Sequence, residues 1–211
     1  MAILEPPPSA QRQQGGEWQE NRLLLNAPPG LLAGDRFFEL CQANPALRME
    51  LTATGRLIIM PPEGAESGHR NADVTIDLGL WNRHVKTGIV FGSSTGFTLP
   101  DGTQCSPDAS WIEKSRWEVL DPVDRKKFAH ICPDFVVELR SETDRLPVLQ
   151  DKMREYIANG ARLGWLIDPQ SQRVEVYRPG QDVRVLENPQ TVSGDPELPG
   201  FVLNLEPIWQ T

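Results

Sequence analysis

The sequence predicts an α/β domain in which a mixed β-sheet is flanked by two long helices, preceded by an N-terminal β-hairpin and a short helix. Two segments, 66–85 and 145–159, carry apolar residues at helical spacing. Two others, 134–139 and 163–167, are nearly continuous apolar runs, which are typical of central strands buried on both faces. The chain has 211 residues, which suffice for one sizeable core but not for two full domains.

The beginning of the chain has the weakest structural signal. Residues 1–20 are rich in Pro, Gln and Gly, so we expect a flexible lead-in there and a single domain over residues 21–211. A strand over 21–25 can precede the next Pro/Gly break. Asp35 is expected to cap a short helix that ends at Asn44-Pro45.

A hairpin and the first long helix come next. Residues 47–53 and 56–60 alternate or run apolar, and Thr54-Gly55 supplies the turn between them. The helix over 66–85 is amphipathic, and Gly88 is expected to end it.

Several short strands separate the two long helices. We expect strands over 89–91 and 97–99, a tight turn at Asp101-Gly102, and a further strand within 106–112 that contains Asp108. The charged stretch 113–131 reads as a short helix and a loop.

The last third of the chain contains the second long helix and its flanking strands. Pro147 stands in the first turn of this helix, a position that proline favours. After the buried strand 163–167, residues 173–177 alternate as expected of an edge strand. The Pro-rich tail, 196–209, carries scattered apolar anchors.

Composition limits the class of protein. No run of about 18 apolar residues occurs, so no membrane span is expected, and without a signal-peptide pattern we expect a cytoplasmic protein. The three cysteines lie far apart and form no CxxC pair, which indicates free thiols. The net charge of −8 argues against a protein that coats nucleic acid.

Two carboxylates stand where apolar residues would be expected. Asp108 follows Pro107 in a short strand, and Glu138 lies near the end of the buried strand 134–139. An unpaired buried charge is costly, so such placement calls for a reason. Two carboxylates on neighbouring strands can share a Mg²⁺ ion, with Mn²⁺ as an alternative. Such an ion polarises a phosphate and activates a bound water.

Lys152 is the third candidate. At about 100° per residue it lies about 40° beyond Tyr156, at the edge of the helix's apolar stripe. From there it could point across the end of the sheet and stabilise a phosphate. An exposed lysine that lies along the core edge is the alternative.

These residues together carry a resemblance. Pro107-Asp108, Glu138-Leu139-Arg140 and a following helix with Lys152 and Tyr156 resemble the PD-(D/E)xK nuclease superfamily. More narrowly, the chain resembles the Uma2 family of restriction-endonuclease-like proteins, which is abundant in cyanobacteria. The matching stretches cover nearly all of residues 35–208, in the family's order: 44–71, 106–112, 133–144, 152–169 and 198–205.

The resemblance implies a restriction-endonuclease-like core and a Mg²⁺-dependent endodeoxyribonuclease that acts on DNA. Asp108 and Glu138 would hold the metal, and Lys152 would position water and phosphate. The motif lysine should stand at position 140, where this chain has Arg140, so Lys152 on the following helix fits its role better. Arg140 could bind phosphate or form a salt bridge with Glu142 or Asp144.

The resemblance also leaves points open. The superfamily often places a carboxylate on the first core helix, which makes Glu66 a fourth catalytic candidate; an acid that favours the helix start is the alternative. Glu50 ranks low. A homodimer is expected by analogy. The acidic net charge favours a second reading, a catalytically inactive nuclease-fold module that binds nucleic acid or protein, and a third is a domain whose buried acids only form ion pairs.

Overall fold

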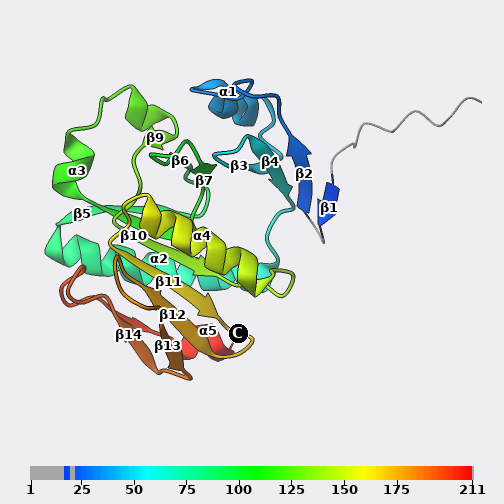
Figure 1. Ribbon diagram of the computed structural model, residues 1–211. Helices are drawn as coiled ribbons and strands as arrows, with labels where there is room; N and C mark the ends of the chain where they lie inside the picture. Colours follow the sequence, from blue (N-terminus) through cyan, green and yellow to red (C-terminus); the bar gives the residue numbers. More distant parts are fainter. Residues whose placement is uncertain (1–16, 20–21, 211) are drawn as a thin grey trace, which may run out of the picture.

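Strand β10 (Phe135–Leu139) lies inside a six-stranded mixed sheet, and all five of its residues are buried, as its apolar run predicts. It pairs in parallel with β11 (Leu163–Asp168) and antiparallel with β8 (Ala109–Glu113). The computed structural model describes residues 17–19 and 22–210 (Figure 1). The order across the sheet is β13 (Arg184–Glu187), β12 (Arg173–Tyr177), β11, β10, β8 and β5 (Gly88–Gly92).

Two long helices cover opposite faces of this sheet, as predicted (Figure 1). Helix α2 (Ala65–Val85) packs on one face and helix α4 (Leu146–Ala158) on the other. Successive strand residues point to opposite faces, so Val137 of β10 joins the α2 cluster and Val136 the α4 cluster. Glu138 shares the face of Val136, and its carboxylate therefore lies under α4.

The predicted hairpin belongs to a second, seven-stranded sheet. Helix α1 (Arg36–Ala43) packs on this sheet through the buried Phe37. Strands from the middle of the chain extend the hairpin, because β3 pairs with β7 at Leu51 and Gln104. The order is β1 (Glu17–Gln19), β2 (Arg22–Asn26), β4 (Arg56–Met60), β3 (Arg48–Leu51), β7 (Gln104–Cys105), β6 (Phe97–Thr98) and β9 (Ala129–His130).

The lead-in predicted over residues 1–20 lies outside the described residues, apart from Glu17–Gln19, which form β1 and pair with β2. A single domain over residues 21–211 stays a prediction. Within the described part of the chain, no helix is long and apolar enough to cross a membrane. The three cysteines are free thiols, as expected.

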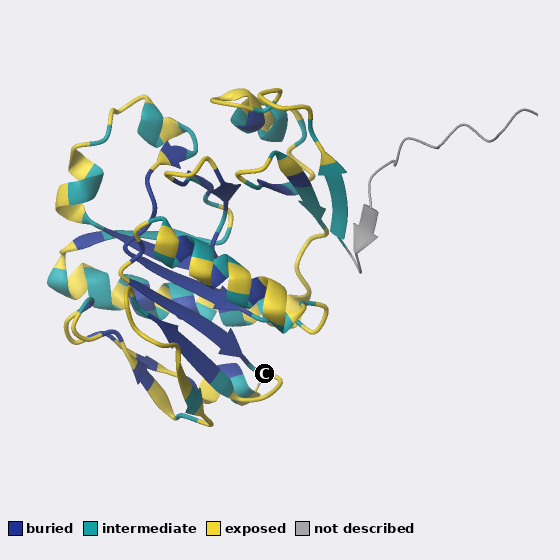
Figure 2. Cartoon of the chain, in the orientation of Figure 1, coloured by how far each residue is buried: buried dark blue, intermediate teal, exposed yellow. Residues whose placement is uncertain are grey.

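The prediction of an edge strand over 173–177 is wrong. β13 pairs with β12 along four residue pairs and takes the edge position instead. The alternation that suggested an exposed face comes from Glu175, which is buried and accepts hydrogen bonds from Gln150 and Tyr177. Figure 2 shows the central strands β10 and β11 of this sheet buried along their whole length, between more exposed elements.

The C-terminal tail closes the α2 face of the sheet. β14 (Thr191–Ser193) pairs with β15 (Val202–Asn204), and α5 (Glu206–Gln210) follows. The predicted apolar anchors are confirmed, since each is at most 2% exposed: Leu198, Phe201, Leu203 and Leu205.

Two local differences concern the ends of elements. Helix α2 ends at Val85, and Lys86 takes the left-handed conformation with φ 59°. Gly88 instead begins β5, where an added Cβ would lie 2.2 Å from the Trp111 ring. Asp108 stands just before β8 rather than within a strand. The charged stretch forms α3 (Lys114–Glu118) and a single 3₁₀ turn, η1 (Asp124–Lys126).

Candidate active site

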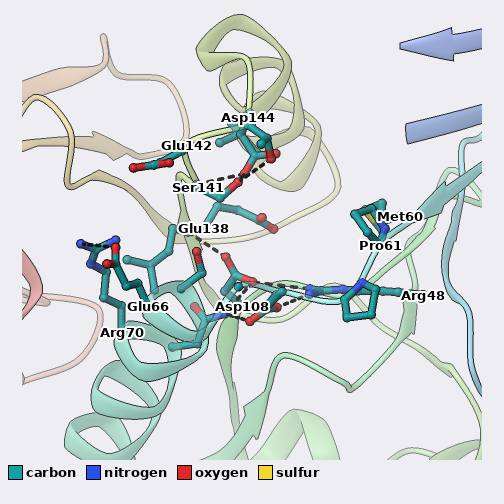
Figure 3. Close-up of a pocket in the computed structure, with 18 of the residues that line it drawn as sticks. Arg48, Met60, Pro61, Glu66, Arg70, Asp108, Glu138, Ser141, Glu142 and Asp144 are labelled. Atoms are coloured by element: carbon teal, nitrogen blue, oxygen red, sulfur yellow. Dashed lines mark hydrogen bonds and ion pairs between the residues drawn. The ribbon is translucent and has the colours of Figure 1, made fainter. Parts of the chain in front are cut away.

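A pocket of about 460 Å³ opens at the carboxyl end of β10 (Figure 3). It is lined by the N-terminal sheet, the first two turns of α2 and the link before them, the loop after β10 and helix α4. Seven acids line it: Glu50, Glu63, Glu66, Asp108, Glu138, Glu142 and Asp144. Four basic residues line it: Arg22, Arg48, Arg70 and Lys152. This excess of acids favours the binding of a cation.

Asp108 is held in the pocket floor by strand β10. Its backbone N–H donates to the carbonyl of Val137 at 3.1 Å, and its Oδ2 accepts the N–H of Leu139 at 2.8 Å. Its Oδ1 faces Asn71 Nδ2 at 3.3 Å and Arg48 Nη2 at 3.5 Å. Burial raises the pKa of Asp108, although the Leu139 N–H and Lys152 partly oppose this.

Glu138 reaches the same pocket from the α4 face of β10. Its Oε1 accepts a hydrogen bond from the hydroxyl of Tyr156 at 2.9 Å and lies 2.9 Å from Lys152 Nζ. Burial raises the pKa of Glu138 to about 7; Lys152 opposes the shift, and the charges of Asp108 and Glu50 add to it. Asp108 and Glu138 are therefore close enough to repel one another.

Lys152 extends from α4 between two carboxylates. Its Nζ lies 2.9 Å from Glu138 Oε1 and 2.9 Å from Glu50 Oε1. Burial alone would lower the pKa of Lys152, but Glu138 and Glu50 hold it above its ordinary value. The side chain is therefore a protonated ammonium at neutral pH, which can stabilise negative charge but cannot accept a proton.

Glu50 is the pocket residue that sequence reasoning underrated. It lies on β3, is 8% exposed, and accepts the N–H of Ser106 at 3.1 Å besides contacting Lys152. Lys152 keeps the pKa of Glu50 below its ordinary value in spite of its burial. The available signal was a charged residue between Met49 and Leu51 in an apolar strand, the same kind of signal that singled out Glu138.

Two other candidates lie apart from these residues. Glu66 lines the pocket, but its side chain is 69% exposed and its carboxylate turns toward Arg70, 3.8 Å away (Figure 3). Arg140 donates to Asp168 Oδ2 at 2.8 Å and to the carbonyl of Asp144 at 3.1 Å. The structure therefore brings Asp108, Glu138 and Lys152 together, and does not bring Glu66 or Arg140 to them.

The donor set of the pocket floor fits a hard divalent cation. Glu138 and Glu50 share the ammonium of Lys152, and Asp108 lies 3.5 Å from the guanidinium of Arg48, so three carboxylates face two cations and leave an excess of negative charge. Mg²⁺ needs only one or two carboxylates and fills its other positions with water and phosphate oxygens. No group of three or more His, Cys, Asp or Glu side chains in the described part of the chain is arranged to hold a metal ion. Asp108 and Glu138 are the candidate ligands because both line the pocket floor where β8 pairs with β10, and solvent would complete the shell.

The raised pKa of Glu138 predicts a pH-dependent stability in the metal-free protein. Between pH 4.5, its ordinary pKa, and about 7, the folded protein keeps a proton that the unfolded chain has released. The free energy of unfolding therefore falls as pH rises across this interval, by up to about 3 kcal/mol. Denaturant titrations in EDTA, with Glu138→Gln as reference, measure this contribution. A difference between the two proteins that stays constant from pH 4.5 to 7 would contradict the prediction.

Comparison with known proteins shows the fold and the family of this chain. Curated proteins give no match. Among solved structures, the chain is similar to a "putative nuclease belonging to DUF820" from Anabaena variabilis, with TM-score 0.64 and 21% identity over 76% of this chain and 89% of that chain. This likeness confirms the predicted nuclease-like fold. The model of the Uma2 family, described as "Putative restriction endonuclease", matches residues 35–206. Since that match spans most of the sequence, the chain belongs to the Uma2 family.

Proposed function

We propose that this protein is a Mg²⁺-dependent endodeoxyribonuclease, with Mn²⁺ as an alternative metal. One observation carries the proposal: two buried carboxylates and a half-buried ammonium, from three separate segments, meet in the floor of one open pocket. Without a ligand the two carboxylates lower stability, because burial raises the pKa of both Asp108 and Glu138. Binding of a cation and a substrate phosphate would offset this loss of stability.

Each residue has a distinct part in this proposal. Asp108 and Glu138 would hold the metal, which when bound supplies a polarised phosphate and a more acidic water. Lys152 donates hydrogen bonds to phosphate oxygens as negative charge grows on them in the transition state. Glu50 fixes the Lys152 ammonium, and Tyr156 fixes the Glu138 carboxylate. Both are positioning residues.

A second candidate function is a catalytically inactive module that binds nucleic acid or protein. The net charge of −8 and the seven acids against four basic residues in the pocket favour it, since phosphates are repelled unless a cation intervenes. The two candidates differ in what a metal does: in the nuclease it enables cleavage, and in the module it does not.

Plasmid nicking tests the proposed function directly. We expect purified protein to convert supercoiled plasmid to the open circle in Mg²⁺ or Mn²⁺, and EDTA to stop the reaction. Gel electrophoresis of time points measures the rate. Intact plasmid after long incubation with either metal would favour the inactive module. Sedimentation of the same protein tests the homodimer expected by analogy.

Metal binding can be tested without any substrate. A ligand that binds only the native state stabilises it, by about 2.7 kcal/mol at a concentration 100-fold above its Kd. Mg²⁺ is therefore expected to raise the thermal midpoint of the protein by several degrees. Scanning calorimetry at rising Mg²⁺ measures the shift, with Ca²⁺ and K⁺ as comparison ions. A midpoint that is unchanged at millimolar Mg²⁺ would exclude a metal site in the resting protein.

A further inference from the structure

We infer that Arg48 and Asn71 form a phosphate-binding subsite beside Asp108, and that the carboxylate of Glu63 occupies this subsite in the free protein. The ligand is a phosphodiester group of a nucleic acid, which replaces Glu63 when the substrate binds. The inference rests on the proposed function, because it says how the same pocket holds its substrate.

Four side chains define the subsite. Arg48 Nη1 contacts Glu63 Oε1, and Arg48 Nη2 lies 3.5 Å from Asp108 Oδ1. Asn71 Nδ2 lies 2.8 Å from Glu63 Oε2 and 3.3 Å from Asp108 Oδ1. A guanidinium and an amide thus hold both oxygens of one acidic group. Both groups donate N–H hydrogen bonds, which phosphate oxygens accept as carboxylate oxygens do, so two phosphate oxygens can take the place of those of Glu63.

Asn71 supplies a second, independent observation. It is 6% exposed and lines the pocket, yet its Oδ1 has no hydrogen-bond partner among the described residues. An unpaired buried amide oxygen lowers stability. It can only accept a hydrogen bond, so a phosphate oxygen cannot pair with it, and the partner that it lacks is a water or a cation that arrives together with the phosphate. Its Nδ2 already donates to two carboxylates, which fixes the orientation of the amide.

The start of helix α2 adds to the attraction for an anion. Residues 64–67, the N-cap and first turn of this 21-residue helix, line the same pocket. The first N–H groups of an α-helix have no partner within the helix, and the helix dipole is positive at this end. No side chain caps this helix. The arginine, the amide and the helix start therefore favour a phosphate at one place.

The position of Glu63 allows a phosphate to displace its carboxylate from the subsite. It belongs to the link Pro61–Gly64 between β4 and α2, and its side chain is 25% exposed, with Arg48 at 29%. An ion pair that water can reach contributes little stability, so exchanging one partner costs little. Lys152 and Glu138, at 18% and 5%, form the more buried pair. Ligand exchange is therefore expected at Glu63 and not at Glu138.

Binding of a fluorescent DNA duplex in EDTA and at low salt tests the subsite while no cleavage can occur. Glu63→Gln is expected to bind the duplex about ten-fold more tightly than wild type. This is the gain expected if the Glu63 carboxylate fills the subsite in about nine-tenths of the wild-type molecules and leaves about one-tenth able to bind. Arg48→Gln is expected to bind more weakly, with a salt slope shallower by about 0.9, the loss of one phosphate contact. Glu142→Gln is the matched control, since it removes one exposed acid from the same pocket.

The double variant Arg48→Gln/Glu63→Gln completes the test. The gain from Glu63→Gln should disappear in the Arg48→Gln background, because the two residues act on one contact. The inference is overturned if Glu63→Gln gains no more than Glu142→Gln, if Arg48→Gln keeps the wild-type slope, or if no variant binds DNA. It is also overturned if inorganic phosphate stabilises Glu63→Gln while all variants bind DNA alike.

These outcomes are separate from those of the cleavage assay. A protein that never cuts but shows the expected binding pattern keeps the subsite and loses only the proposed catalysis. A protein that cuts but shows equal binding and equal salt slopes in all variants keeps the catalysis and loses the subsite.

Discussion

Replacing Asp108 with Asn is expected to lower the rate of plasmid nicking by about a thousand-fold or more, the size of loss seen when a catalytic group is removed. The amide keeps the shape of the side chain and an oxygen that can accept the Leu139 N–H. It removes the negative charge that the proposed metal needs. The rate of open-circle formation in Mg²⁺, compared with wild type prepared in the same way, measures the effect.

The stability of the same variant separates a functional role from a structural one. Burial raises the pKa of Asp108, so its charge lowers the stability of the resting protein. Asp108→Asn should therefore unfold at the same temperature as wild type or higher, and its midpoint should no longer respond to Mg²⁺. Asp151→Asn, an exposed acid on α4 that pairs with Arg154, is the matched control and should keep its activity. Nicking by Asp108→Asn within ten-fold of wild type would overturn the assignment.

Local patterns predicted the central elements of the fold and part of the candidate site. Apolar runs and helical spacing identify β10, β11, α2 and α4, and all four elements are present within a few residues of their predicted limits. Asp108 and Glu138 stand out because charge interrupts or borders apolar strands. Whether these residues meet depends on strand order, which periodicity does not contain. The pairing of β8 with β10 places them side by side.

Non-local contacts explain what the sequence pattern missed. Glu50 reaches the pocket because β3 pairs with β7 and Glu50 accepts the N–H of Ser106, 56 positions away. Glu63 lies in an irregular link, three residues before Glu66. Outside a helix or strand, no periodicity predicts which way a side chain points, so the sequence did not single out Glu63. Whether a strand lies at the edge or in the interior of a sheet also depends on non-local pairing. β12 is an interior strand because β13 pairs with it.

Replacing Lys152 with Met is expected to lower the free energy of unfolding by about 3 kcal/mol, because it leaves the buried Glu138 and Glu50 without their cation. Denaturant titration at neutral pH in EDTA measures the loss. Arg154→Met on the same helix removes a pair in which both side chains are more than half exposed, so it should change stability by less than about 0.5 kcal/mol. Equal stability of Lys152→Met and wild type would show that the ammonium does not balance these carboxylates.

The double variant Lys152→Met/Glu50→Gln tells whether Lys152 serves stability alone. Neutralising Glu50 removes one of the two uncompensated acids, so the double variant should recover a large part of the lost stability. Nicking should not recover, because the Lys152 ammonium, held above its ordinary pKa, is the proposed donor to the phosphate in the transition state. Recovery of both stability and nicking would mean that Lys152 only balances charge in the pocket floor. Recovery of stability alone means that the ammonium acts on the substrate.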